Sequence, residues 1–414
     1  MRTLVCFGFV AGLSLAAAAA EVAIAPDRMF EIDGQRTFVI GLYENPDDDA
    51  VLAEVARAGF NLVRCSDNVA ALDRLAAHGL HAWVNVGGRI DLGKDGTGDA
   101  SGLEAMVASC GAHPALLVWE EPDEALWNCW LEAYRSRKPL KETFDLFFDR
   151  VNTTSAGFLA GYNALKRLDP KHPVWINHAA GNSIEHLALI ARAADIVGCD
   201  IYPVMPYPTR PVDISHSGLS WVGICATRMQ QSAPEKPVWM VLQGCGWADA
   251  GDVFKVREGV VGQRPNFHET RFMAYDAIVR GARAILYWGT HRIAKDSEMW
   301  GDLLKMAREL ADRQDLIAAP DAAIVPSVET FSVFGKALIG VKALGKEVGG
   351  KTWWIIVNEF AFPMTCTLSG LDKLNGTVYK EADTAKEATV TSGVLRLNLG
   401  AYDAQILKPA SGGQ

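Results

Sequence analysis

Carboxyl groups and aromatic rings occur together at the ends of several apolar segments of this 414-residue chain. Glu120 and Glu121 end the segment ALLVWEE (115–121), and Glu44 and Asp200 lie at the ends of two others. Two carboxyl groups can act as acid and base, or as acid and nucleophile, in the cleavage of a glycosidic bond, and apolar neighbours raise the pKa of the acid. Trp and Tyr rings stack on the C–H faces of sugars. These residue types therefore favour chemistry on a carbohydrate.

Eight short apolar segments, alternating with helical patterns, predict the elements that would position these side chains. As expected for strands buried on both faces, the segments are rich in aliphatic and aromatic residues; they span 38–44, 61–65, 81–87, 115–121, 173–179, 195–202, 237–244 and 282–289. Helical spacing recurs over 47–60, 67–79, 182–195, 266–282 and 296–314. Repeated strand–helix units predict parallel strands, and eight units close an α/β fold, the (β/α)8 TIM barrel. The alternative is an open doubly wound sheet, which needs a Gly-rich first turn that this sequence lacks.

The carboxyl ends of the strands form the functional face of such a barrel, so polar residues there are the site candidates. Glu121, Asp200 and Glu44 are the candidate catalytic residues. Candidate substrate-binding residues lie at the same strand ends and in the loops that follow; they are Arg64, Asn85, Glu120, His178, Tyr202, Gln243, Trp247, Trp288 and Trp127. We expect no metal and no cofactor, because the cysteine spacing fits no zinc site and no phosphate loop or dinucleotide fingerprint follows a strand.

The fourth strand ends in Trp119-Glu120-Glu121-Pro122, which resembles the Asn-Glu-Pro motif of clan A glycoside hydrolases. Arg64, Tyr202, Trp288 and the lead-in IDGQRTFVIGLYE also match that clan, and the resemblance covers about residues 30–315. It implies a barrel enzyme that hydrolyses glycosidic bonds, with Glu121 as the acid/base. The C-terminal part resembles the small β-domain that many such enzymes carry.

The sequence departs from the clan at two positions. Glu120 replaces the usual Asn, and Gln243 stands at the end of the seventh strand, where the clan has its nucleophilic Glu. A neutral amide cannot act as a carboxylate nucleophile. Three interpretations remain open: Glu121 with Asp200 or Glu44 as an inverting pair, substrate-assisted catalysis with Gln243 orienting an acetamido group, and a barrel that binds glycan without cleaving it. A scaffold protein would instead have a flat barrel top.

The candidates also have structural interpretations. Glu121 could be a carboxylate at a helix start, and Glu44 could be a capping or surface acid. Asp200 could pair with Arg64, since a buried Arg needs a carboxylate partner. His178 is more typical of a core histidine. Trp127 and Trp247 could pack beneath loops, and the tryptophans within strands are expected in the core: Trp83, Trp175 and Trp239.

The first 20 residues have the pattern of a secretory signal peptide. Arg2 precedes an apolar stretch, and Ala18 and Ala20 fit a cleavage site before Glu21. The apolar core is short for a membrane anchor. We therefore expect a protein exported to the periplasm or the cell exterior, without membrane contact after cleavage.

Pattern and composition set the remaining expectations. Residues 21–318 are expected to form the barrel, and 319–414 a small antiparallel, β-sandwich-like domain, because alternating strands and turns begin near 322.

A net charge of −9 argues against nucleic acid, so the expected partner is a carbohydrate, and the oligomeric state stays open. In an exported protein, Cys110 and Cys129 could form a disulfide.

Overall fold

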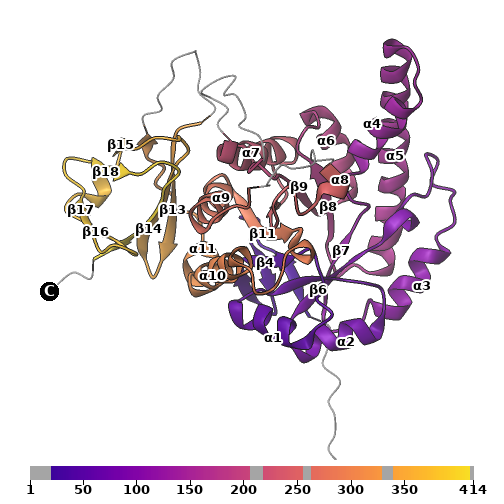
Figure 1. Ribbon diagram of the computed structural model, residues 1–414, viewed down its shortest axis with the longest axis horizontal. Helices are drawn as coiled ribbons and strands as arrows, with labels where there is room; N and C mark the ends of the chain where they lie inside the picture. The colour runs from indigo at the N-terminus through magenta and orange to yellow at the C-terminus, as the bar shows by residue number, and fades with distance from the viewer. Residues whose placement is uncertain (1–19, 206–217, 255–262, 329–338, 411–414) are drawn as a thin grey trace, which may run out of the picture.

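A closed barrel of eight parallel strands forms the body of the protein. The computed structural model describes residues 20–205, 218–254, 263–328 and 339–410. The strand order around the barrel is β10-β11-β4-β5-β6-β7-β8-β9. Helices surround it, and antiparallel strands from the C-terminal part stand to one side (Figure 1). The predicted (β/α)8 TIM barrel with a small C-terminal β-domain is confirmed, and the closed order excludes an open doubly wound sheet.

All eight predicted barrel strands form within their predicted ranges. They are β4 (Val39–Leu42), β5 (Leu62–Cys65), β6 (His81–Asn85), β7 (Leu116–Glu120), β8 (Val174–Ala179), β9 (Ile196–Asp200), β10 (Val238–Gln243) and β11 (Ala282–Trp288). Nearly every residue in them is buried, as the continuous apolar segments indicated.

Each of the five predicted helical ranges contains a helix. In α1, the Asp48 side chain accepts from the amide of Ala50 at 2.7 Å, and Gly59 ends the helix with φ of 97°. The helices are α1 (Asp49–Ala58), α2 (Val69–Ala77), α3 (Ser101–Cys110), α4 (Ala125–Arg135), α5 (Leu140–Leu168), α6 (Ile184–Ile190), α7 (Trp221–Ser232), α8 (Gly251–Phe254), α9 (Phe267–Val279), α10 (Glu298–Asp312) and α11 (Gln314–Ile317).

A small N-terminal sheet covers the bottom of the barrel. Its strands are β1 (Val22–Ile24), β2 (Phe30–Ile32) and β3 (Gln35–Thr37). Asp33 and Gly34 form the turn between β2 and β3, with φ values of 51° and 74°. Phe30 packs on Trp239 with ring centroids 5.3 Å apart, and both belong to an interior cluster with Trp83 and Trp175. Because this sheet fills the amino end, a ligand would approach the barrel interior from the carboxyl ends of the strands.

The C-terminal part consists of two antiparallel sheets that enclose a core of their own. One has the order β12-β15-β18 and the other β13-β14-β19-β16-β17. The core between them contains Trp354, Ile356, Leu368 and Leu395. The strands are β12 (Ser327–Val328), β13 (Val341–Val348), β14 (Lys351–Asn358), β15 (Met364–Ser369), β16 (Val378–Glu381), β17 (Glu387–Thr389), β18 (Leu395–Leu399) and β19 (Ala404–Pro409).

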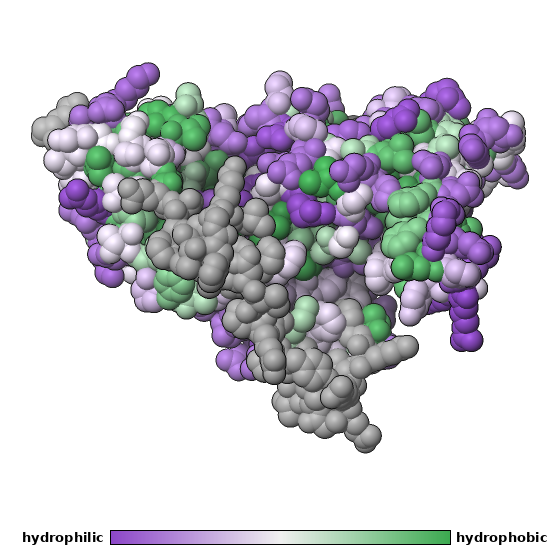
Figure 2. All heavy atoms as spheres, turned by 90° about the horizontal axis from the view of Figure 1, so that it is seen from above, coloured by the Kyte–Doolittle hydropathy of each residue, from purple (hydrophilic) through white to green (hydrophobic). Residues whose placement is uncertain are grey.

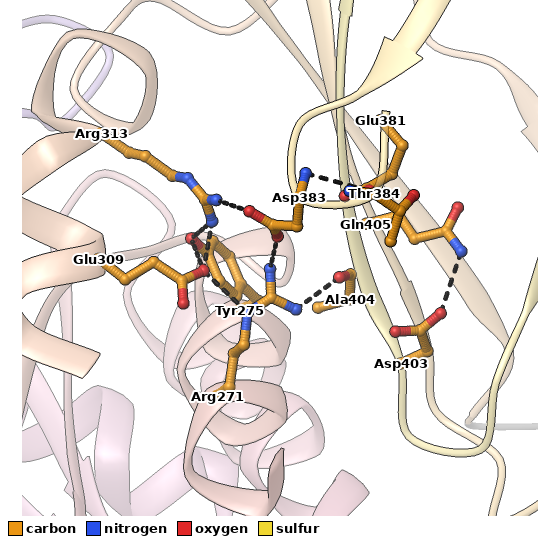
Figure 3. A network of polar contacts seen from close by, with 10 residues as sticks. All are labelled: Arg271, Tyr275, Glu309, Arg313, Glu381, Asp383, Thr384, Asp403, Ala404 and Gln405. Atoms are coloured by element: carbon orange, nitrogen blue, oxygen red, sulfur yellow. Dashed lines mark hydrogen bonds and ion pairs between the residues drawn. The ribbon is translucent and has the colours of Figure 1, made fainter. Parts of the chain in front are cut away.

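The larger sheet docks on the barrel helices through both apolar and charged contacts. Ile355 and Ile406, on its outer face, belong to the same buried cluster as the barrel helices. At the edge of this contact, Arg271 of α9 binds Asp383 at 2.7 Å, and Arg313 binds the same carboxyl (Figure 3). Glu309 of α10 accepts from both arginines. The sheet is therefore held in one position on the barrel.

A second charged cluster lies at the start of β11, where the two parts of the chain join. Asp321 accepts from Arg283 at 2.7 Å and from Lys346 at 2.7 Å. Both cations are buried, while Asp321 is partly exposed. Against the effect of burial, hydrogen bonding from Arg283 and the charge of Lys346 lower the pKa of Asp321 to about 2.

No disulfide links Cys110 and Cys129, because both thiols are free and buried. Among the described residues, no helix is long and apolar enough to cross a membrane. The expected signal peptide, apart from Ala20, lies outside the described residues.

We predict that Asp321→Asn destabilises the protein by about 2 kcal/mol. This is less than the loss expected when one partner is removed from a fully buried ion pair, because Asp321 is partly exposed. The substitution leaves two buried cations without a counter-charge. Urea unfolding at pH 7 measures the change, and Asp312→Asn, at an exposed position of α10, is the matched control. The lowered pKa of Asp321 also makes the stability of the wild type fall as the pH drops from about 4 to about 2. In this range the folded protein keeps Asp321 ionised, whereas the unfolded chain takes up the proton. An equal loss in both variants would contradict this role.

Candidate active site

Glu120, the last residue of β7, points into the mouth of the barrel. Its buried carboxyl accepts hydrogen bonds from the Tyr43 hydroxyl at 2.7 Å, Asn85 Nδ2 at 2.8 Å and Trp83 Nε1 at 3.2 Å. Burial and the charge of Asp123 raise the pKa of Glu120 to about 7, although the bonds from Asn85 and Tyr43 oppose the shift. Three residues, two from β6 and one from the loop after β4, are thus fixed around one carboxyl of β7.

Asp123 lies in the loop between β7 and α4 and is exposed to solvent. Its Oδ1 accepts from Asn177 Nδ2 of β8 at 2.9 Å. The surrounding protein raises the pKa of Asp123, whereas the Asn177 bond and the charge of Arg64 oppose that rise. In turn, the charge of Asp123 contributes to the raised pKa of Glu120 and of Glu124. The pKa values of these three carboxyls are therefore linked through the charge of Asp123.

Glu124 and Asp200 place two more carboxyls beside Asp123. Glu124 has φ of 49°, the left-handed region that side-chain residues rarely adopt, and such conformations cost on the order of 1–3 kcal/mol and concentrate at functional sites. Burial and the charge of Asp123 raise the pKa of Glu124 to about 7, while a hydrogen bond with Asp200 opposes the rise. Burial and then the charges of Glu124 and Asp123 raise the pKa of Asp200 well above its usual range.

A cavity of about 950 Å³ opens next to this carboxyl cluster, which we define as Glu120, Asp123, Glu124 and Asp200. Tyr43 and Asn85, the hydrogen-bond partners of Glu120, line the cavity together with Glu44, Arg64 and His291. Arg64 is exposed, and its positive charge opposes the rise in the pKa values of Glu120 and Asp123. It forms no ion pair with any residue that the structure describes. The four carboxyls do not line the cavity themselves; Glu120 is joined to its wall through Tyr43 and Asn85.

Aromatic rings border the site on the side of β9 and β11. Tyr202 stacks on Trp288 with centroids 5.1 Å apart and planes 25° apart. Trp247 donates its indole N–H to the Tyr202 carbonyl at 3.1 Å, which anchors the loop after β10. Trp127 is 40% exposed on the first turn of α4. Flat rings of this kind suit the apolar faces of sugars.

Glu121 lies outside this site, contrary to the expectation from the Glu-Pro motif. Because side chains alternate along a strand, Glu121 points the opposite way from Glu120, into the layer of helices. Both carboxyl oxygens are buried and have no hydrogen-bond partner in the described part of the chain. Burial raises the pKa of Glu121 well above its usual range, although the charge of Lys236 opposes this and that of Asp195 adds to it. This neutral carboxyl is therefore turned away from the barrel mouth.

Three further candidates have their polar groups occupied or hidden. Glu44 lines the cavity but pairs with Lys295 at 2.6 Å and accepts from the Thr290 hydroxyl. Gln243 donates from Nε2 to the carbonyls of Val204 and Cys245, both at 3.0 Å, and its Oε1 accepts from the Val204 amide at 2.9 Å. His178 is buried on the helix side of β8, and burial lowers its pKa to about 3.

The structure thus brings Glu120, Asp200, Asn85 and Arg64 together, and it places Tyr202 and Trp288 beside them. It adds two carboxyls that the sequence analysis did not consider, Asp123 and Glu124. The sequence signal that indicates these two carboxyls is the run Glu-Glu-Pro-Asp-Glu at the end of the fourth strand, in which every acid precedes the first turn of a helix.

Comparison with known proteins supports the fold. The chain matches no protein-family model and no curated protein. Its structure is similar to that of a glycoside hydrolase, with a TM-score of 0.60 and 12% identity over 94% of this chain and 96% of that chain. A family 5 glycoside hydrolase from Bacteroides vulgatus gives 0.58 and 13% over 95% and 93%. A catalytic mutant of a family 42 β-galactosidase from G. stearothermophilus gives 0.55 and 10% over 90% and 98%. Identities this low show a shared fold.

We predict that the raised pKa values of Glu120 and Glu124 make the protein lose stability as the pH rises from about 4.5 to about 7. The folded protein binds these protons more tightly than the unfolded chain does, so their contribution is full below pH 4.5 and disappears above 7. Glu124→Gln should make this slope shallower and raise stability at pH 8 by about 1 kcal/mol. Urea unfolding between pH 4 and 8 measures both effects, with Asp312→Asn as the control. Identical slopes for Glu124→Gln and wild type would show that Glu124 titrates normally.

Proposed function

We propose that this protein is an exported glycoside hydrolase that acts on a glycan or oligosaccharide through the carboxyl cluster. The observation that carries the proposal is the cluster in which Asp123, bound by Asn177, lies next to a Glu124 whose pKa is raised to about 7. Glu124 can keep a proton near neutral pH, as a general acid must, while the Asn177 hydrogen bond and the Arg64 charge favour the charged form of Asp123. The shared barrel fold of solved glycoside hydrolases agrees with this assignment. Export rests on the sequence of residues 1–20 alone.

In this proposal Glu124 donates a proton to the glycosidic oxygen as the bond to the anomeric carbon breaks. Asp123 takes a proton from the water that attacks that carbon, so one water is consumed and two sugar hydroxyls are produced. The Arg64 charge and the Asn177 hydrogen bond favour the charged form of Asp123. Asp200, protonated beside Glu124, holds that carboxyl in place. Glu120 positions Tyr43 and Asn85 at the cavity wall.

Gln243 cannot take the catalytic role that the residue at this position has in the clan that the sequence resembles. Both its amide oxygen and its amide nitrogen bind backbone groups, so it offers no free group to orient an acetamido substituent. Substrate assistance through Gln243 and a nucleophile at the end of β10 are therefore not part of the proposal. The absence of a carboxyl at this position favours, as a second candidate, a barrel that binds glycan without hydrolysing it.

We predict that Asp123→Asn and Glu124→Gln each lower hydrolysis by about 100-fold or more, the usual contribution of a general acid or base. The measurement is release of reducing ends from a panel of neutral and acidic glycans. Activity should fall above about pH 7, where Glu124 loses its proton. Glu121→Gln is the matched control, because its buried carboxyl faces the helices.

Loss of activity in Glu121→Gln with full activity in Asp123→Asn would overturn the assignment. Glycan binding by the wild type without release of reducing ends, unchanged in Glu124→Gln, would support the second candidate instead.

A further inference from the structure

Helices α4 and α5 form a hairpin that projects from the barrel beyond the other helices (Figure 1). α4 begins at Ala125, directly after the acids Asp123 and Glu124 of the carboxyl cluster. The hairpin thus begins next to the proposed active site, and its tip lies ten residues further along α4, or roughly 15 Å at 1.5 Å per residue.

Aromatic rings follow one face of α4 from the active site to this tip. Trp127, Trp130 and Tyr134 are spaced three and four residues apart, so they lie on one side of the helix. Tyr134 is 66% exposed. Trp130 stacks on Tyr134 with centroids 6.0 Å apart and planes 30° apart. The face opposite to solvent carries small apolar residues such as Ala133 and Cys129, which pack inward.

The first turns of α5 extend this aromatic surface. Phe144 lies 5.6 Å from Trp130 between ring centroids, and Phe148 lies 6.1 Å from Phe144. Phe144 and Phe148 are both exposed, and so is Leu140 at the tip. Viewed from above, hydrophobic and hydrophilic surfaces lie side by side at this end of the molecule (Figure 2). Large rings left in contact with water on a projecting element indicate a binding surface.

The tip of the hairpin is strongly basic although the chain as a whole carries a charge of −9. The segment YRSRKPLK (134–141) contains four cations and no acid. Lys141 pairs with Asp145 at 2.6 Å. Arg135, Arg137 and Lys138 are exposed and form no ion pair with any residue described by the structure. These three charges are therefore available to an anionic ligand.

The same residues surround a hollow in the surface. A cavity of about 650 Å³ is lined by Trp130, Tyr134, Arg135, Arg137 and Lys138. One wall is therefore aromatic and the other cationic. Aromatic faces suit the C–H surface of a sugar ring, and a guanidinium binds a carboxylate or sulfate through paired hydrogen bonds.

We infer that this hollow, together with the aromatic face of α4, binds an anionic polysaccharide, carrying carboxylate or sulfate groups, outside the carboxyl cluster. The choice of a carbohydrate over other polyanions rests on the proposed function. A second copy of the chain fits less well, because two such tips related by a twofold axis would repel each other. A membrane surface fits less well, because the rings and cations line a hollow rather than a convex edge.

Binding of dextran sulfate and of polygalacturonate to the full chain, against uncharged dextran, tests this inference. Affinity electrophoresis and titration calorimetry should show binding of at least one anionic polymer, weakening as salt rises because exposed charges are screened. The triple variant Arg135→Ala/Arg137→Ala/Lys138→Ala should lose affinity at least tenfold. Tyr134→Ala should lose affinity several-fold while keeping the salt dependence, because it removes a ring and no charge.

The matched control is Lys351→Ala/Lys373→Ala/Lys386→Ala, which removes three exposed cations from the C-terminal sheets. It should bind like the wild type, and unfolding curves confirm that all variants are folded. Equal losses in both triple variants, or preference for uncharged dextran, would overturn the inference. So would stronger binding to vesicles of phosphatidylcholine and phosphatidylglycerol than to either polymer, or a dimer that the Arg135→Ala/Arg137→Ala/Lys138→Ala variant dissociates. Because these readouts measure binding, they hold or fail independently of hydrolysis.

Discussion

The crowding of like charges at the mouth of the barrel is the constraint on which the proposed chemistry depends. Glu120, Asp123, Glu124 and Asp200 cannot all ionise together, because each charge raises the proton affinity of its neighbours in a site with little water. Arg64 and Asn177 favour the charge on Asp123. The raised pKa values of Glu120 and Glu124, both about 7, let these carboxyls keep or lose a proton near neutral pH, which is what acid–base hydrolysis requires.

The fold could be predicted because it rests on patterns that are local in the sequence. Each barrel strand is a short apolar run, and some helices begin at a recognisable signal, such as Asp48 before α1 or the capping box formed by Asn266 and Glu269 at α9. Eight repeats of this pattern leave few alternatives to a closed barrel. The positions of strand ends, and hence the list of polar residues near the mouth, followed from the same patterns.

The site could be predicted only in part, because the direction of a side chain depends on a register that spacing does not determine. Along β7 a shift of one residue exchanges the inside and the outside of the barrel. The motif favoured Glu121, but the structure turns Glu120 toward the cavity and Glu121 toward the helices. Asp123 and Glu124 enter the site only because the loop after Pro122 folds back over the barrel, with Glu124 in a left-handed conformation. Nothing in a single sequence specifies such a bend.

For the remaining candidate residues, contacts with residues distant in the sequence determine whether the side chain is available to a ligand. Glu44 looks like a free acid until Lys295, which lies 251 positions later, is seen to pair with it. Gln243 looks like a substitute for a catalytic residue, yet it ties the loops after β9 and β10 together through backbone hydrogen bonds. Glu124 also has two roles, because it is a candidate acid and is the residue that directly precedes α4. A polysaccharide chain seated along the aromatic face of α4 would therefore run directly toward the acid, so that the orientation of one helix would align the binding surface with the chemistry.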